Sequence, residues 1–215
     1  MSTTEITTVT ALPSADNSKK RKLKAILAGG LVLGIGAAVT LAAWNDSEFV
    51  NGAFGSGHFK MMGSKDGVIP FENYDTSGAA NALSFSDGFN NLSRDEVVAA
   101  PYVVHLDADS TYSGEVTVES AAGSTGTDEL RYGIIEVPSV AGCSTAALPT
   151  PENTVVPANT KFNTDPGEGS FTLDKPVQGN PGANVYLCVL VSATSNLPQD
   201  TTATATWKLV AKSNS

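Results

Sequence analysis

The chain has 215 residues and is acidic, with 22 Asp and Glu against 13 Lys and Arg and a formal net charge of −9. Like charges repel, so this composition argues against nucleic acid as a partner and against an anionic membrane surface. The chain has only two cysteines and two histidines. Neither cysteine has a second Cys or a His at ligand spacing, so no zinc site is expected.

The first 42 residues predict an N-terminal extension followed by a helical signal peptide. Residues 1–18 are polar and too poor in apolar side chains to fold. A basic cluster at residues 19–24 then precedes 19 uncharged residues, 25–43, which as a helix would be about 28 Å long. That length suits either a cleaved signal or a retained membrane anchor. The glycines and the small residues at its end favour the signal.

The end of this segment predicts a signal-peptidase cleavage site. A cut after Ala42 places Ala42 at −1 and Thr40 at −3, and it makes Ala43 the mature N-terminus. A cut one residue later would place the bulkier Leu41 at −3. Cleavage removes the basic cluster and leaves a domain with a net charge of about −12. The expected processing partner is a signal peptidase, and membrane contact is expected only through the uncleaved segment.

Residues 57–215 predict an all-β domain, because runs rich in β-branched and aromatic residues alternate with turn signals. The expected strands are residues 57–62, 68–71, 83–86, 97–106, 114–120, 130–137, 169–173, 185–193 and 203–210. A short helix is expected within 77–83 or 92–97. About nine strands with frequent turns favour an antiparallel β-sandwich, jelly-roll-like in arrangement. Residues 43–56 would form a separate mature N-terminal segment.

Side-chain alternation assigns faces to these strands. In residues 203–210, Trp207 and Leu209 fall on one face and Lys208 and Val210 on the other, which is the pattern of a half-buried strand. Residues 185–191 are apolar on both faces and should form a central strand. Four prolines in residues 138–163 predict a long surface loop or a sheet edge, because proline lacks the N–H that a ladder needs.

The two cysteines, Cys143 and Cys188, both fall in the exported region. In an oxidising compartment a disulfide is the default, and it would tie the central strand to the loop around Cys143. Two buried thiols are the alternative.

No catalytic constellation stands out in the sequence, and no cofactor or metal is expected. His58 and His105 have no HExxH context, and His105 is expected to be exposed on its strand. Asp107 and Asp109 resemble the start of a calcium loop that lacks its later glycine and glutamate, which favours a simple turn. Residues 197–201 resemble a sortase signal without its glycine or a following hydrophobic span, so wall anchoring by that route is not expected.

Two stretches carry a resemblance to a known family. The first is the junction Ala42-Ala-Trp-Asn-Asp46, together with Gly52-Ala-Phe54 and Gly57-His-Phe59. The second, a looser match, consists of residues 91–95 and residues 101–104. The junction is similar to that of secreted proteins with a SipW-type signal, which include the TasA/camelysin family of Gram-positive biofilm-matrix proteins. The "alternate signal-mediated exported protein" group is the nearest likeness. The usual Pro-Gly turn of the second stretch is replaced here by Ser93-Arg94.

This resemblance implies a jelly-roll-like domain at a Gram-positive cell surface and self-association into fibres, in which the mature N-terminal segment completes a neighbour's sheet. The expected assembly residues are Trp44, Asn45, Asp46, Phe49 and Phe54. A self-packed or disordered N-terminus is the alternative for this segment. Two other functions stay open: a monomeric secreted adhesin or binding module, and a secreted hydrolase. Protease activity described for camelysin-like proteins is not carried over, since no residues here match it.

Overall fold

The computed structural model describes residues 19, 21–24, 55–86, 88–177 and 179–214. The chain divides into two compact units, Met1–Phe54 and Gly55–Ser215. In the first unit, the described residues are helical and exposed. In the described part of the chain, no helix has both the length and the apolar character needed to cross a membrane. The expected signal segment, residues 25–43, lies outside the described residues.

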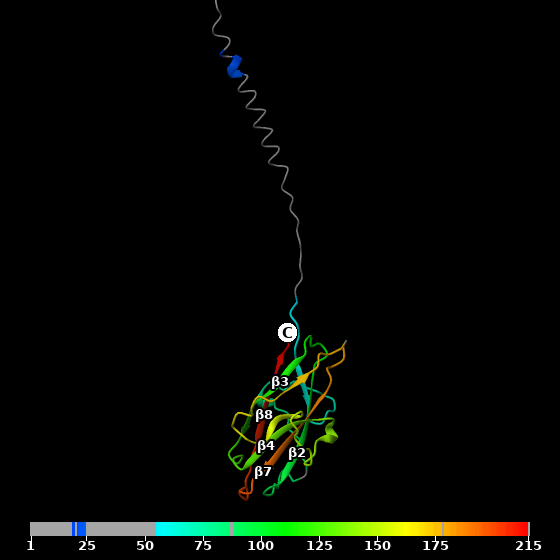
Figure 1. The fold of residues 1–215 in the computed structure, drawn as a ribbon, viewed down its shortest axis with the longest axis vertical. Coiled ribbons are helices and arrows are strands. Elements are labelled where there is room, and N and C mark those ends of the chain that lie inside the picture. Colours follow the sequence, from blue (N-terminus) through cyan, green and yellow to red (C-terminus); the bar gives the residue numbers. More distant parts are fainter. Residues whose placement is uncertain (1–18, 20, 25–54, 87, 178, 215) are drawn as a thin grey trace, which may run out of the picture. The chain divides into compact units, whose positions relative to one another are not determined.

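The described residues of the second unit form eight strands in two antiparallel sheets, so the prediction of an all-β fold is confirmed (Figure 1). The first sheet has the strand order β1-β2-β7-β4-β5 and the second has the order β6-β3-β8. The strands are β1 (Met61–Ser64), β2 (Val97–Leu106), β3 (Gly114–Gly123), β4 (Leu130–Val137), β5 (Thr154–Lys161), β6 (Ser170–Leu173), β7 (Val185–Ala193) and β8 (Ala205–Ser213). Two 3-10 turns, η1 (Ser77–Ala79) and η2 (Val140–Gly142), lie in the connections.

The five-stranded sheet is centred on β7, as its two apolar faces predicted. β7 pairs with β2 on one side and with β4 on the other, with Cys188 opposite Pro101 and Ile135. Strands β2, β4 and β7 have the bounds expected from the sequence. Long apolar runs locate such central strands because both of their faces are covered.

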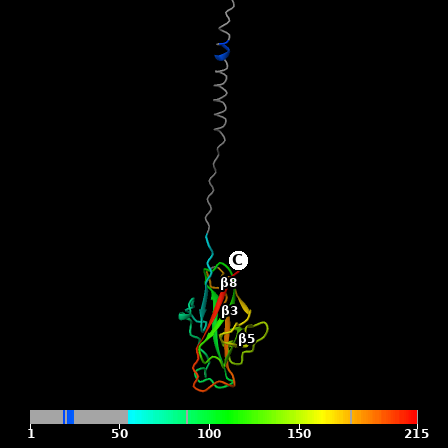
Figure 2. The same cartoon turned by 90° about the vertical axis from the view of Figure 1, so that its left-hand side faces the viewer.

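The three-stranded sheet places β3 between the short β6 and the nine-residue β8 (Figure 2). β3 and β8 pair along their whole length, from Gly114 opposite Ser213 to Gly123 opposite Ala205, with an irregularity between Val118 and Ser120. The predicted alternation in β8 is confirmed, since Trp207 and Leu209 are partly buried and Lys208 and Val210 are exposed.

The main core takes buried side chains from both sheets. Its largest fully buried members include Tyr132, Ile134 and Leu187 from the five-stranded sheet and Val116 and Leu173 from the three-stranded sheet. At one end the core is aromatic, where Tyr132, Phe162 and Trp207 form tilted and edge-on ring pairs with centroids 4.8–6.1 Å apart. Such pairs add to the stabilisation that comes from burying the rings.

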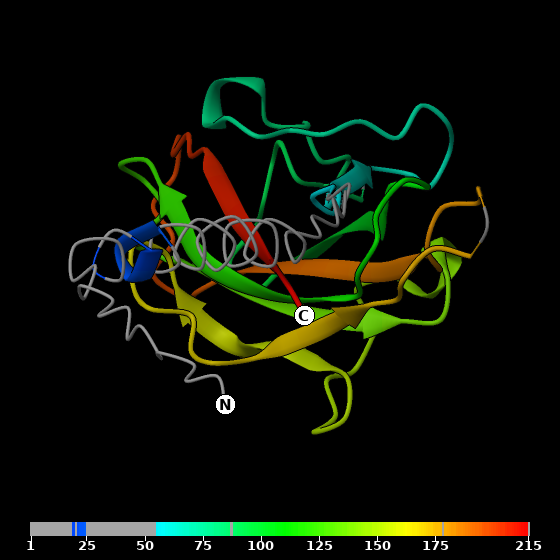
Figure 3. The same cartoon turned by 90° about the horizontal axis from the view of Figure 1, so that it is seen from above.

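A second, smaller cluster lies on the opposite face of the five-stranded sheet, where Cys188 and Ile135 are buried under the loop that follows β4. Cys143 of that loop and Cys188 of β7 form a disulfide, with Cα atoms 5.0 Å apart. The long connection between β1 and β2 (Figure 3) supplies Phe71, whose ring stacks on His105. His105 is 7% exposed, so the expectation that it is exposed is wrong, because this distant loop covers its face.

Several predicted segments differ from the structure. The first strand begins at Met61, not at residue 57, and residues 68–71 and 83–86 form no strand. The 68–71 segment contains the cis Ile69–Pro70 bond, and the main-chain contact of the 83–86 segment is the Ser86 N–H donating to the Ala99 carbonyl. The proline-rich 138–163 segment, expected to be a loop or edge, contains β5. That strand pairs only with β4 among the described strands, so Pro157 sits at a sheet edge where proline is tolerated.

Candidate functional site: the outer edge of β8

The residues predicted for processing and assembly lie outside the described residues. They are Thr40, Ala42 and Ala43 at the cleavage site and Trp44, Asn45, Asp46, Phe49 and Phe54 in the mature N-terminal segment. Their roles remain predictions. The structure describes instead a candidate acceptor for such a segment, which is a sheet edge to which an extended strand could be added.

The surface is the outer edge of β8. This strand pairs with β3 on one side, and among the described strands none pairs with its other side. Just beyond the strand ends, the Ser124 N–H donates to the Thr204 carbonyl and the Asn214 N–H donates to the Ser113 carbonyl. Antiparallel hydrogen bonds alternate along a strand, so the even-numbered residues of β8 bond to β3. The odd-numbered residues direct their N–H and C=O groups to the outer edge.

The odd-numbered residues of β8 also face the core. Ala205, Trp207, Leu209 and Ala211 are partly buried and pack against the main cluster. On the solvent face, Lys208 forms an ion pair with Glu119 of β3, and Lys212 lies opposite Glu115. β8 therefore has an apolar face toward the core and a charged face toward solvent. A strand added at its edge would need apolar side chains on the first face and polar or charged side chains on the second.

An aromatic cavity of about 140 Å³ opens beside the first half of β8. Rings from three separate parts of the chain line it, together with small residues of β8 and its approach. The lining includes Phe85, Phe89, Phe162, Ala203, Ala205 and Trp207. The Phe89 side chain is 57% exposed, which marks the solvent side of this group.

Two polar atoms at the aromatic end of the core are buried without a hydrogen-bond partner among the described residues, Tyr132 Oη and Trp207 Nε1. Burial raises the pKa of the Tyr132 phenol, and the charge on Asp165 adds to the rise. Native proteins usually satisfy such groups. The aromatic end of the core therefore carries unused hydrogen-bonding capacity.

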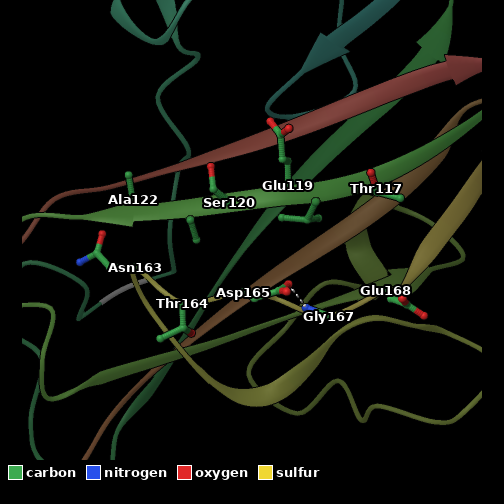
Figure 4. Close-up of a pocket in the computed structure, with 11 residues that line it drawn as sticks. Thr117, Glu119, Ser120, Ala122, Asn163, Thr164, Asp165, Gly167 and Glu168 are labelled. Carbon is green, nitrogen blue, oxygen red and sulfur yellow. Dashed lines mark hydrogen bonds between the residues drawn. The ribbon is translucent and has the colours of Figure 1, made fainter.

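A wider hollow of about 750 Å³ lies along β3 (Figure 4). Residues 117–122 of β3 line it together with residues 163–165, 167 and 168 of the loop between β5 and β6. It carries the carboxylates of Glu119, Asp165 and Glu168. β6 pairs with β3 only up to Thr117, and the Asn163 N–H donates to the Ala121 carbonyl farther along. The hollow is the gap between these two attachments. Asp165 is used locally, since its Oδ1 accepts from the Gly167 N–H at 2.9 Å.

The residues considered for catalysis or metal binding do not converge. His58 Nε2 lies 3.6 Å from Asp107 Oδ2 in a partly exposed pair, whereas the His105 Nδ1–H donates to Asn184 Oδ1 at 2.8 Å. Among the described residues, no group of three or more His, Cys, Asp or Glu side chains could hold a metal ion. Asp107 instead begins a turn, since its carbonyl accepts from the Ser110 N–H.

Two further features are explained by packing. Burial raises the pKa of Tyr102 to about 12, a shift expected of a phenol that packs against the core. Leu197, the first residue of the sortase-like sequence, is 8% exposed, and its carbonyl accepts from Arg94 Nε–H. That sequence is thus anchored in the fold at its first residue.

No protein-family model matches the chain. No curated protein matches it either. The edge of β8 and the cavity beside it are therefore the features on which a functional proposal can be built.

Proposed function

We propose that this chain is a secreted, non-catalytic structural protein of a Gram-positive cell surface or biofilm matrix. In this proposal its two sheets form a jelly-roll-like β-sandwich, and copies assemble into fibres by strand addition at the outer edge of β8. The strand would come from the mature N-terminal segment, residues 43–54, of another copy. Cleavage by a signal peptidase after Ala42 would release that segment.

One observation carries the proposal: the nine-residue β8 has an outer edge without a strand partner among the described residues. Natural proteins usually shorten, bulge or cover such edges, because a free row of N–H and C=O groups recruits other chains. β8 pairs with β3 from end to end, and the one register irregularity of this pair falls between two β3 residues, Val118 and Ser120. Strand addition would satisfy the odd-numbered backbone groups of β8.

Secretion is supported by two observations of different kinds. The Cys143–Cys188 disulfide suits an oxidising compartment. The N-terminal sequence has the basic, uncharged and small-residue order of a signal peptide. The acidic domain would repel itself and anionic surfaces, so self-association would depend on a specific contact such as the β8 edge.

The test is to block the edge of β8 without disturbing its pairing with β3. Ala211 is odd-numbered and lies opposite Val116, so Ala211→Pro removes an outward N–H while keeping the bonds to β3. We expect Ala211→Pro to abolish fibres in electron micrographs of the processed protein. Ala211→Ser keeps the N–H and should assemble normally. Fibres from a folded Ala211→Pro protein would refute strand addition at this edge.

The alternatives predict different solution behaviour. A monomeric adhesin or binding module would remain monomeric in size-exclusion chromatography at high concentration and would bind wall polysaccharide. A secreted hydrolase would cleave a protease substrate and lose this activity in His58→Ala or His105→Ala variants. No arrangement of the described residues favours the hydrolase over assembly.

A further inference from the structure

The aromatic cavity beside β8 has the size of one ring. Its volume is about 140 Å³, and an apolar cavity of about 150 Å³ holds one benzene molecule. Phe85, Phe162 and Trp207 surround this space. The Phe85 and Trp207 centroids are 6.3 Å apart and the Phe162 and Trp207 centroids 5.8 Å apart. These rings already contact one another at separations typical of aromatic pairs, and a further ring placed among them would favour tilted or edge-on contacts.

The cavity and the free edge share residues. Ala205 and Trp207 line the cavity, and both are odd-numbered, so their backbone groups point to the outer edge of β8. Cross-strand neighbours in a sheet place their side chains on the same face. A strand added beside Ala205 and Trp207 would therefore direct its core-facing side chains toward this cavity.

The mature N-terminal segment has one large apolar residue on one of its two extended faces. With a period of two, Asn45, Ser47, Phe49, Asn51 and Ala53 share a face, and Phe49 is the only large side chain among them. The cavity has room for one ring, and this face of the segment carries one ring. The two asparagines on the same face also bring amide oxygens, which can accept hydrogen bonds.

The opposite face of the segment fits the charge on β8. Asp46 and Glu48 fall on the face away from Phe49, which also carries Trp44, Val50 and Phe54. The two carboxylates would lie on the solvent side of the sheet when Phe49 faces the core. Lys208 and Lys212 lie on that side of β8 and are exposed. Opposite charges on neighbouring strands favour this orientation of the added strand, and the reversed orientation would place the carboxylates against the core.

We infer that the Phe49 side chain of a second copy occupies the aromatic cavity, with Asp46 and Glu48 of the same segment facing Lys208 and Lys212. This inference rests on the proposed strand addition and specifies its register. Phe49 is then the anchor residue of the junction between copies, and the Phe85–Phe162–Trp207 cavity is its receptor.

The experiment compares self-association of processed, exported proteins by sedimentation equilibrium. Phe49→Ala removes the ring from the donor, and Ala205→Leu fills the cavity of the acceptor. Burial of one Phe side chain predicts that each variant weakens self-association at least about tenfold. Val50→Ala, a neighbouring change on the other face, should stay within about twofold of the parent protein. Circular dichroism would establish that Ala205→Leu is folded.

A mixture of two variants tests the pairing directly. Phe49→Ala copies retain an open cavity, and Ala205→Leu copies retain the ring. An equimolar mixture should therefore form one-to-one dimers that do not extend into fibres. Restored fibres, or no association in the mixture, would overturn the pairing.

A peptide assay gives a readout that does not require fibres. The peptide covers residues 43–54 with Trp44→Phe, and Trp207 fluorescence of a Trp44→Phe protein reports its binding, since the chain has only two tryptophans. The parent peptide should shift the emission, and the same peptide with Phe49→Ala should not. If toluene shifts the emission and the peptide does not, the cavity takes a free aromatic molecule and the inference is wrong.

The outcomes separate the inference from the proposed function. If Ala211→Pro abolishes fibres while Phe49→Ala assembles as well as the parent protein, the edge is used and the cavity assignment is wrong. If Ala211→Pro leaves fibres intact, strand addition at β8 is wrong, whatever the effect of Phe49→Ala.

Discussion

The ring of Phe71 stacks on the imidazole of His105, with ring centroids 4.2 Å apart and an interplanar angle of 28°. This contact joins the connection after β1 to the outer face of β2. It also covers a histidine that is already held by Asn184. The stack is therefore a tether for the long connection between β1 and β2.

Phe71→Ala should destabilise the domain by about 1–2 kcal/mol, because it removes an aromatic pair and uncovers His105. Urea unfolding followed by circular dichroism measures the change. Ile69 belongs to the same connection but is 84% exposed, so Ile69→Ala should change stability by less than about 0.5 kcal/mol. Equal effects of the two variants would contradict a tethering role for the stack.

Gly169 should not tolerate a side chain. A Cβ atom at this position would overlap the Val155 carbonyl oxygen of β5, which is backbone and cannot rotate away. Gly169→Ala should therefore cost about 1–3 kcal/mol, the range for overpacking. At Gly78 a Cβ atom would meet nothing within 4 Å, so Gly78→Ala serves as the control and should leave the thermal midpoint nearly unchanged.

Glu136 should make stability depend on pH. Burial raises the pKa of its carboxyl above the ordinary value of a glutamate. The folded protein then binds this proton more tightly than the unfolded chain does. As the pH rises from the pKa of Glu136 in the unfolded chain to its pKa in the folded protein, the free energy of unfolding therefore falls. Glu136→Gln should raise the thermal midpoint at pH 7, and the gain should vanish below about pH 4.

A control for this pH effect is Glu152→Gln, because Glu152 is an exposed residue of the loop before β5. Its midpoint should follow that of the parent protein at every pH. A gain for Glu136→Gln that is the same at pH 4 and pH 7 would show that charge is not its cause.

Reduction of the disulfide should lower the free energy of unfolding by up to about 4 kcal/mol. Cys143 and Cys188 are 45 residues apart. Closing a loop of this length lowers the conformational entropy of the unfolded chain, which raises its free energy by about 4 kcal/mol. Urea titrations with and without dithiothreitol measure the loss. The Cys143→Ala/Cys188→Ala protein should show no response to the reductant, and a response there would reveal a different origin.

The strands that the sequence located well are those that are apolar on both faces or alternate clearly. β2, β4 and β7 were predicted with their observed bounds, because central strands leave long apolar runs. β5 was not predicted with its own bounds, because the four prolines of residues 138–163 indicated only a loop or a sheet edge. It forms at an edge, where one side of the strand needs no hydrogen bonds.

The local sequence pattern of a strand could not predict which of its residues are covered by a distant segment of the chain. His105 follows the alternation of an exposed position, but Phe71 reaches it from another part of the chain. The aromatic cavity is also assembled from distant residues, with Phe85, Phe162 and Trp207 on three separate segments. Its only sequence signal was Trp207 on the core face of its strand. The donor residues Trp44, Asn45, Asp46, Phe49 and Phe54 remain predictions of the sequence.

The pairing of β3 with β8 also has a consequence for how the chain folds. Gly114 lies opposite Ser213 and Gly123 opposite Ala205, so the partners are separated by roughly 80–100 residues of chain. Because the chain is made from its N-terminus, and on export would also emerge in that direction, β3 has no β8 to pair with until residues 205–213 have followed. A chain that stops before Ala205 would leave Val116 and Val118 without this neighbour. Completion of the domain thus depends on residues 205–213, and an emerging chain should be most prone to aggregation just before these residues appear.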